Sequence, residues 1–392
     1  MVLSMLGLWV GFIWVVQLSE RSQRQTHIQQ VADHATEAFA IIAARDLNFK
    51  AVTNRAMIAN AIAIAQLVGL NSYVNMMTLT SQNSSLLTSW VPYLNAVMAR
   101  IAQTLQSFRQ SFQSASVSLI NLENILIQLL SNSQLLFHAA AAATALQTSS
   151  RIVELADENL ELVLLNHATM PEFSYLWLFY QHRQSPLHEY IDMVQRSRDG
   201  FSRHRSYRWF SVGSGVSARF EKWGGTEITA NAGTRMSWQA IDVATLRVRL
   251  GPFSRYTVPI GWGGSYVGMR PPIAGRVDAN AFGGAYAARR SLSQQSARQA
   301  RMLQPTLPAP LYSSVEPEDR FPRITLVVRE KATSEAAQGF AIARAEVRFE
   351  RPEALWPRRD RARERANLFN ALWRAQLVPI SIAEQWLLEQ QV

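Results

Sequence analysis

Residues 28–64 read IQQVADHATEAFAIIAARDLNFKAVTNRAMIANAIAI, and this stretch decides the fold of the N-terminal half. It contains no Pro and no Gly, the residues that most often interrupt a helix. Its apolar residues recur at spacings of three and four, which places them on one face of an α-helix. The first five of them are Ile28, Val31, Ala35, Phe39 and Ile42. The stretch therefore predicts a long amphipathic helix.

The residues before this stretch predict a membrane span. Met1 to Ser19 contain no charged residue and form an almost unbroken apolar run. A helix of this length spans about 27–29 Å, close to the hydrocarbon thickness of a bilayer. A signal peptide would need a basic start and a small-residue cleavage site, and a buried helix is rarely apolar on every face. We therefore predict a retained transmembrane helix at residues 1–19.

The residues after this stretch continue the helical pattern to about residue 168. Residues 56–99 contain no charged residue, which is typical of a helix packed against another helix. We expect breaks at residues 69–72 and at Pro92, and residues 94–165 are expected to be helical for most of their length. Residues 20–168 are thus predicted to form an antiparallel helical hairpin or small bundle. Polar residues in the charge-free run 124–150 argue against a second membrane span.

The second half of the chain has the character of a β-domain. Thirteen of the eighteen glycines lie between Gly213 and Gly284, and short alternating runs separate them, as in hairpins. Residues 323–330 and 341–349 read as two further strands, and residues 291–301 as a short helix. The predicted fold class is α+β. After the helical half we expect an aromatic and basic connector at 169–204, a mainly antiparallel β-rich domain at 205–355, and C-terminal helices at 356–392. The two helices of that last segment are expected within 361–376 and 380–391.

Composition and motifs exclude several classes of protein. With 48% hydrophobic and 17% charged residues, the chain is too apolar to be disordered. The absence of cysteine excludes disulfide scaffolds, thiolate metal sites and cysteine nucleophiles. Residues 213–217 lack the central Ser of a nucleophile elbow, and residues 261–264 lack the third glycine of a dinucleotide loop.

Two clusters of titratable residues are candidates for a chemical site. The spacing of His182, His188 and Glu189 matches no helical zinc pair. The carboxylates of Asp157, Glu158 and Glu161 read as a solvated helix face, not as an acid–base pair. We therefore predict no catalytic residue, no cofactor and no metal, and the chain is not expected to be an enzyme.

The positive charge is confined to the second half. Residues 1–200 hold eleven Lys/Arg and thirteen Asp/Glu, whereas residues 201–392 hold twenty-eight and sixteen, a net charge of +12. Arg203, Arg205 and Arg208 alternate with aromatic residues, a pattern compatible with nucleic acid, with anionic lipid or with an exposed strand start. We expect these three arginines to form a basic surface facing anionic headgroups or an acidic partner subunit, and no nucleic acid.

Residues 29–66, directly after an apolar helix, resemble the TadE/TadG-like proteins of the Tad (Flp) pilus-assembly system. Val31 to Asp33 match the first part of the family's pattern, and Leu47 to Asn60 (LNFKAVTNRAMIAN) match the second closely. Two later stretches are similar to the same family. They are residues 238–264, with Ala240-Ile241-Asp242 and PIGWG at 259–263, and residues 366–375 (ANLFNALWRA).

The resemblance implies a minor pilin-like structural component of Tad pilus assembly. It implies a single-pass inner-membrane protein with its bulk in the periplasm and with other pilus-assembly or pilin-like subunits as partners. Two arginines after the apolar run would instead favour a cytoplasmic body, and we follow the resemblance. The candidate assembly interface consists of Asp33, Asn48, Phe49, Asn54, Arg55 and Asn60. The alternative is a membrane-anchored envelope receptor or adhesin that binds an extracytoplasmic ligand.

Overall fold

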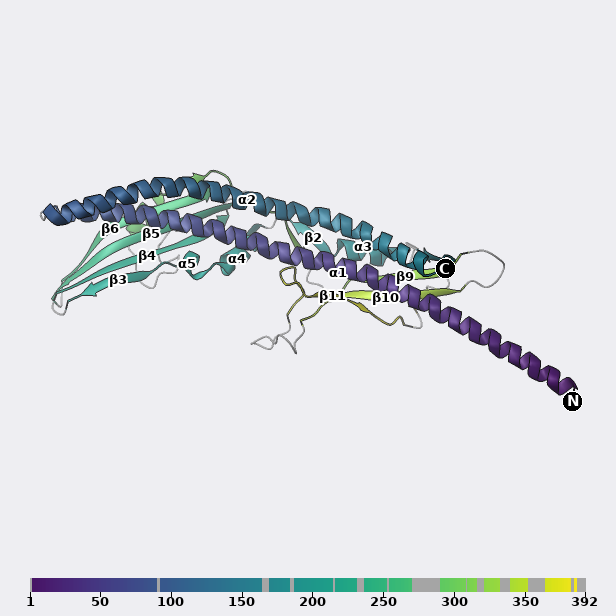
Figure 1. Cartoon of the computed structure of the whole chain (residues 1–392). Helices are drawn as coiled ribbons and strands as arrows, with labels where there is room; N and C mark the ends of the chain where they lie inside the picture. The colour runs from purple at the N-terminus through teal and green to yellow at the C-terminus, as the bar shows by residue number, and fades with distance from the viewer. Residues whose placement is uncertain are drawn as a thin grey trace. The chain divides into compact units, whose positions relative to one another are not determined.

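The chain combines helix and sheet, with an apolar N-terminal helix and a β-rich C-terminal region (Figure 1). The computed structural model describes residues 2–89, 92–163, 169–183, 187–213, 216–230, 236–251, 254–269, 290–307, 309–315, 321–331, 339–351, 364–381 and 384–385. Two compact units are present: unit 1 is Met1–Asn54, Asn132–His182 and Tyr312–Val392, and unit 2 is Arg55–Ser131 and Arg183–Leu311. Each unit joins pieces of the chain that are distant in sequence.

The first helix is longer than predicted. Helix α1 runs from Val2 to Leu87 without interruption, so the expected break at residues 69–72 is wrong. Gly69 is there for close packing: a Cβ at this position would lie 2.7 Å from a guanidinium nitrogen of Arg205 and 2.9 Å from the hydroxyl of Thr226. Packing of this kind offsets the ~1 kcal/mol that an interior Gly costs a helix.

The second helix, α2, spans Pro92–Ala156 and begins at the proline that marked the predicted break. Proline suits the first turn of a helix because its missing N–H would have no intrahelical partner. In unit 1 the two helices are antiparallel. The hydroxyl of Ser149 donates to the carbonyl of Ala35, and the amide of Gln134 donates to Asn54. Residue numbers along α2 therefore decrease in the direction in which those along α1 increase.

The larger sheet of unit 1 is antiparallel with strand order β1-β9-β10-β11. The strands are β1 (Leu160–Val163), β9 (Arg323–Glu330), β10 (Phe340–Phe349) and β11 (Trp373–Leu377). Helix α3 (Met170–Leu178) precedes β2 (Tyr180–Arg183), which pairs with β8 (Tyr312–Val315).

Strand β11 corrects the prediction of a helix over residues 361–376. The indole of Trp373 is buried and lies edge-on to Phe179 and Phe349, with ring centroids 5.8 and 5.3 Å away. Residues 373–377 then pair with β10, and this tertiary pairing overrides their helical propensity. Residues 352–363, 382–383 and 386–392 of the expected C-terminal helices lie outside the described part of the chain.

The core of unit 1 lies between α1 and the larger sheet. Phe39, Ala43 and Leu47 on one face of α1 pack with Leu326 and Val347 of the sheet. Closer to the N-terminus, Ile28, Val31 and Ala35 belong to a second cluster that contacts the same sheet. The apolar face predicted from the sequence is therefore the buried face of α1.

Unit 2 contains a five-stranded sheet of order β3-β4-β5-β6-β7, in which β7 is parallel to β6 and the other pairs are antiparallel. The strands are β3 (Tyr207–Val212), β4 (Val216–Ala230), β5 (Met236–Leu250), β6 (Ser254–Gly268) and β7 (Arg301–Gln304). The helices of the unit besides α1 and α2 are α4 (Leu187–Ser197), α5 (Gly200–Arg203) and α6 (Arg290–Arg298).

The three central strands of unit 2 are much longer than the short runs predicted. Several glycines that marked turns in the sequence lie inside strands, because the sheet packs closely on α1 there. A Cβ on Gly263 would collide with the backbone of α1 at Ser72 and Met76, and one on Gly261 would collide with Thr80. A glycine inside a strand often marks such a close backbone approach.

Candidate functional site

The N-terminal part of α1 is exposed. Residues 7–26 are all exposed, whereas Ile28 is fully buried. The exposed side chains include two tryptophans, Trp9 at 66% and Trp14 at 70%. By length and composition, this end of α1 is apolar enough to be a membrane span or a signal sequence. Helix α2 passes the same test of length and composition.

Asn48 joins two of the family-like stretches. Its amide nitrogen donates to the carbonyl of Trp373 at 2.8 Å, and its amide oxygen accepts from the N–H of Trp373 at 3.0 Å. Residues 47–60 and 366–375, more than 300 residues apart, therefore meet in unit 1. The neighbouring Phe49 stacks on Phe137 with ring centroids 4.2 Å apart.

Asn54 uses its whole side-chain amide within the chain. It is 1% exposed, and its nitrogen donates to the carbonyls of Ser313 and Leu368 at 2.7 and 2.8 Å. Its oxygen accepts from the amide of Gln134 on α2 at 2.8 Å. Asn54 therefore ties α1 to α2 and to two segments near the C-terminus.

The other residues of the predicted interface are placed differently. Asp33 is half-buried and accepts from Gln29 at 2.9 Å, Asn60 is half-buried, and Arg55 is exposed. Arg55 is exposed because α1 turns this position away from the core face that holds Asn54. Asp33, Asn48, Phe49 and Asn54 make contacts within unit 1.

Replacing Asn54 by Leu is expected to destabilise unit 1 by about 2 kcal/mol, because two buried carbonyls and the Gln134 amide lose a partner. Arg55→Leu is the matched control, since it changes an exposed neighbour and should alter stability by less than about 0.5 kcal/mol. Thermal unfolding of both variants measures the difference. Equal midpoints would contradict the assignment of Asn54 to a buried hydrogen-bond network.

A buried charge cluster in unit 1 was not predicted from the sequence. A carboxylate oxygen of Asp46 accepts a hydrogen bond from the ammonium of Lys50 and lies 2.6 Å from Nδ1 of His138. Lys50 and Asp46 are both buried. Burial lowers the pKa of Lys50 to about 8, and the charge of Asp46 opposes this shift. The available signal was an Asp and a Lys four residues apart, a spacing that places both on one face of the helix, in a chain with three lysines.

This cluster predicts that unit 1 becomes more stable as the pH rises from about 7.5 to 9.5. Lys50 loses its proton near pH 8 in the folded state but only above pH 10 when unfolded, so the unfolded state binds more protons in this window. The gain should be about 1–2 kcal/mol, measured as the unfolding free energy at the two pH values. Lys50→Met should remove it, and an unchanged pH dependence in that variant would contradict the prediction.

The structure contradicts the predicted basic surface at Arg205. Arg203 and Arg208 are exposed, but Arg205 is 3% exposed and is committed to internal partners. Its guanidinium pairs bidentately with Asp242, at 3.1 and 2.9 Å, and also donates to Thr226 at 2.8 Å. Arg205 lies two residues after α5, and its guanidinium reaches Thr226 of β4 and Asp242 of β5, which bury it.

Asp242 is the centre of a buried ion network in unit 2. Its carboxylate also accepts from the ammonium of Lys222 at 2.6 Å, and neither side chain of this pair is exposed. Burial alone would raise the pKa of Asp242, but Arg205 and Lys222 outweigh it and hold the pKa below its usual range. Lys222 additionally lies over the rings of Tyr73 and Tyr207. Both carboxylate oxygens of Asp242 thus accept hydrogen bonds from buried cations, and the network has a structural role.

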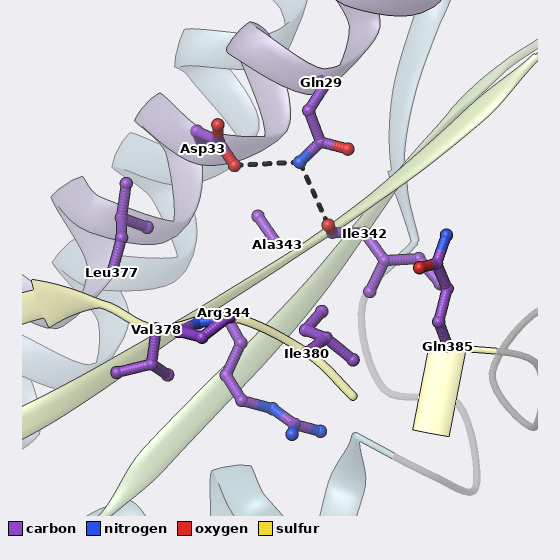
Figure 2. A pocket seen from close by; sticks show the side chains of 10 residues that line it. Gln29, Asp33, Ile342, Ala343, Arg344, Leu377, Val378, Ile380 and Gln385 are labelled. Carbon is purple, nitrogen blue, oxygen red and sulfur yellow. Dashed lines mark hydrogen bonds between the residues drawn. The ribbon is translucent and has the colours of Figure 1, made fainter. Parts of the chain in front are cut away.

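A cavity of about 370 Å³ in unit 1 is lined by α1, β10 and the residues after β11 (Figure 2). Gln29 and Asp33 from α1 face the backbone of Ile342 across it. The amide of Gln29 donates both to Asp33 and to the carbonyl of Ile342, at 2.9 and 3.1 Å. Arg344 in the same wall is paired with Glu172 and Glu384. Arg344 is thus neutralised by carboxylates outside the lining, whereas Asp33 is hydrogen-bonded to the neutral amide of Gln29.

Among the residues that the structure describes, no group of three or more His, Asp or Glu side chains is arranged to hold a metal ion. Comparison of the chain with protein-family models, curated proteins and solved structures found no match.

Proposed function

We propose that the chain is a single-pass inner-membrane protein, with its bulk in the periplasm, that acts as a minor pilin-like structural component of Tad (Flp) pilus assembly. The observation that carries this proposal is the exposed apolar end of α1, which continues without a break into the stretch that resembles the TadE/TadG-like proteins. Its expected partners are other pilus-assembly or pilin-like subunits.

A bilayer accounts for the exposure pattern of α1. Ten large apolar side chains between Met5 and Leu18 are exposed to at least 39% each. Burying one such side chain fully contributes about 1.5–3 kcal/mol, so this segment strongly favours lipid over water. Because α1 has no break between Val2 and Asn54, the anchor is joined to unit 1 by helix and not by a flexible linker.

The internal roles of the family-like residues support a structural function. Asn48 and Asn54 connect α1 to residues near the C-terminus, and Asp242 and Gly263 organise the sheet of unit 2. Residues used in this way build a scaffold. The cavity beside Gln29 and Asp33 is the feature that favours the alternative of an envelope receptor, but its polar groups already bond to one another.

Anchoring is tested by placing arginines in the apolar run. The double change Phe12→Arg and Val15→Arg should move the chain from the membrane fraction to the soluble fraction, since each central Arg costs about 2.5–3.5 kcal/mol. Val52→Arg is the matched control, because Val52 is 57% exposed on α1 outside the run, and this variant should stay in the membrane. An unchanged membrane fraction for the double variant would refute the anchor.

Topology and role need two further measurements. A reporter that is active only in the periplasm, fused after Val392, should be active. Deletion of the gene should abolish pili, and the wild-type chain should restore them. Cytoplasmic reporter activity, or normal piliation without the gene, would overturn the proposal.

A further inference from the structure

Helix α2 presents two opposite faces in unit 2. One face is buried, and Asn124 and Ser131 on it hydrogen-bond to Gln304 and to the carbonyl of Leu311. Ile127 lines a small cavity with Ala61 and Ile64 of α1, so this face packs on the interior of the unit. The opposite face is exposed along the whole stretch from Leu94 to Leu129.

The exposed face has the heptad spacing of a coiled coil. Eleven residues follow one another at alternating steps of three and four, and all of them are exposed: Leu94, Val97, Ile101, Thr104, Phe108, Ser111, Ala115, Ser118, Leu122, Ile125 and Leu129. Eight of the eleven are apolar, and Thr104, Ser111 and Ser118 are the exceptions. The next position of each heptad is apolar throughout: Met98, Leu105, Phe112, Leu119 and Leu126. A period of 3.5 sustained over five heptads keeps one seam facing a partner helix over about 54 Å.

The exposed apolar area of this face is larger than the largest apolar patch of a typical monomeric protein. Phe108, Leu122, Ile125 and Leu129 are each exposed to between 51% and 59%. Together the large apolar side chains of the face expose on the order of 700 Å². The largest apolar patch of a typical monomer is about 300–600 Å², and a stable interface buries about 800 Å² per partner.

The residues that border the seam argue for a protein partner and against lipid. The positions on its other side are Arg100, Ser107, Ser114, Asn121 and Gln128. Glutamines at 103, 106 and 110 add further polar groups to the same turns. A helix immersed in hydrocarbon would bury these groups without partners, and a helix lying on a bilayer surface is usually flanked by lysines and arginines.

We propose that α2 pairs with α2 of a second copy of this chain, in parallel, through the seam from Leu94 to Leu129. A heterotypic partner is usually selected by complementary charges beside the seam, and here Arg100 is the one charged residue at those positions. In the parallel pair each residue of the seam meets its own counterpart. Ala115 and the serines at 111 and 118 let the two helices approach closely at the centre.

The parallel orientation rests on the membrane anchoring proposed above, because two copies held in one bilayer by their N-terminal helices point the same way. The self-association itself needs only the face of α2. It can therefore be measured on purified full-length protein in detergent, without pili, and its failure is distinguishable from failure of the proposed function.

The absence of cysteine makes disulfide cross-linking a clean test. In a parallel pair the two copies of residue 115 lie within disulfide range, so Ala115→Cys should form a cross-linked dimer under mild oxidation. Gln110→Cys is the matched control, since it lies at an exposed position of the same helix that points away from the seam. The dimer yield at residue 115 should exceed that at residue 110 by about tenfold.

A second substitution, Ile125→Glu, tests whether the two copies meet through the seam of α2. Ile125 is 56% exposed, so Ile125→Glu should leave the unfolding midpoint unchanged while placing a charge in the seam. In the Ala115→Cys protein it should reduce cross-linking to the level of Gln110→Cys. A yield at residue 115 no higher than at residue 110, as expected for a face covered by lipid or by another protein, overturns the proposal. Cross-linking that persists with Ile125→Glu also overturns it.

Discussion

Asp242→Asn is expected to destabilise unit 2 by about 3–5 kcal/mol, because it leaves two buried cations without a counter-charge. The carboxylate lies 2.9 Å from the guanidinium of Arg205 and 2.6 Å from the ammonium of Lys222. All three side chains are at most 2% exposed. Water therefore cannot replace the lost charge, and the two cations would face each other across a neutral amide.

Urea denaturation monitored by tryptophan fluorescence measures this effect, since Trp223 and Trp238 are each 1% exposed in unit 2. The control is Asp192→Asn, which removes the exposed ion pair of Asp192 with Arg196 and should cost less than about 0.5 kcal/mol. A loss of stability at Asp242 no larger than at Asp192 would show that the network is not buried as described.

Gly263→Ala is expected to destabilise unit 2 by about 3 kcal/mol, at the upper end of the cost of overpacking a core. The added Cβ would collide with the carbonyl oxygen of Ser72 and the amide nitrogen of Met76, both of which are backbone atoms of α1. A flexible side chain could move aside, but the backbone of a helix inside the unit cannot. The strand and the helix would have to separate along their contact.

Gly200→Ala is the matched control for this prediction. No atom lies within 4 Å of a Cβ built on Gly200, so the substitution should be neutral or slightly stabilising. Unfolding midpoints of the two variants are compared under the same conditions. A midpoint for Gly263→Ala equal to that of Gly200→Ala would contradict the close packing of β6 on α1.

The residues of the predicted assembly interface differ in whether they are bonded inside the fold or exposed on its surface. Asn48 and Asn54 are hydrogen-bonded within unit 1, so a substitution there is expected to act first on the fold. Arg55 is exposed, and it is the residue of the predicted interface that can report on contacts with another subunit without disturbing the core. Assembly assays should therefore separate Arg55 variants from Asn54 variants.

Local sequence determined the two long helices, α1 and α2, and the apolar end of α1. Spacings of three and four and the lack of Pro between Glu20 and Val91 specify a helix directly, because each turn depends on residues nearby in the chain. The same holds for β9 and β10, whose runs of β-branched and apolar residues match residues 323–330 and 341–349.

Tertiary structure alone decided the features that join distant segments. Gly69 looked like a break and Gly263 like a turn, but both permit close packing between α1 and residues more than 130 positions away. The sequence predicts that Arg205 belongs to a basic surface, but in the structure its guanidinium pairs with the buried carboxylate of Asp242. Residues 373–377 form a strand because they pair with β10. In each case the deciding partner is remote in sequence, and the free energy of the contact outweighs the local preference of the chain.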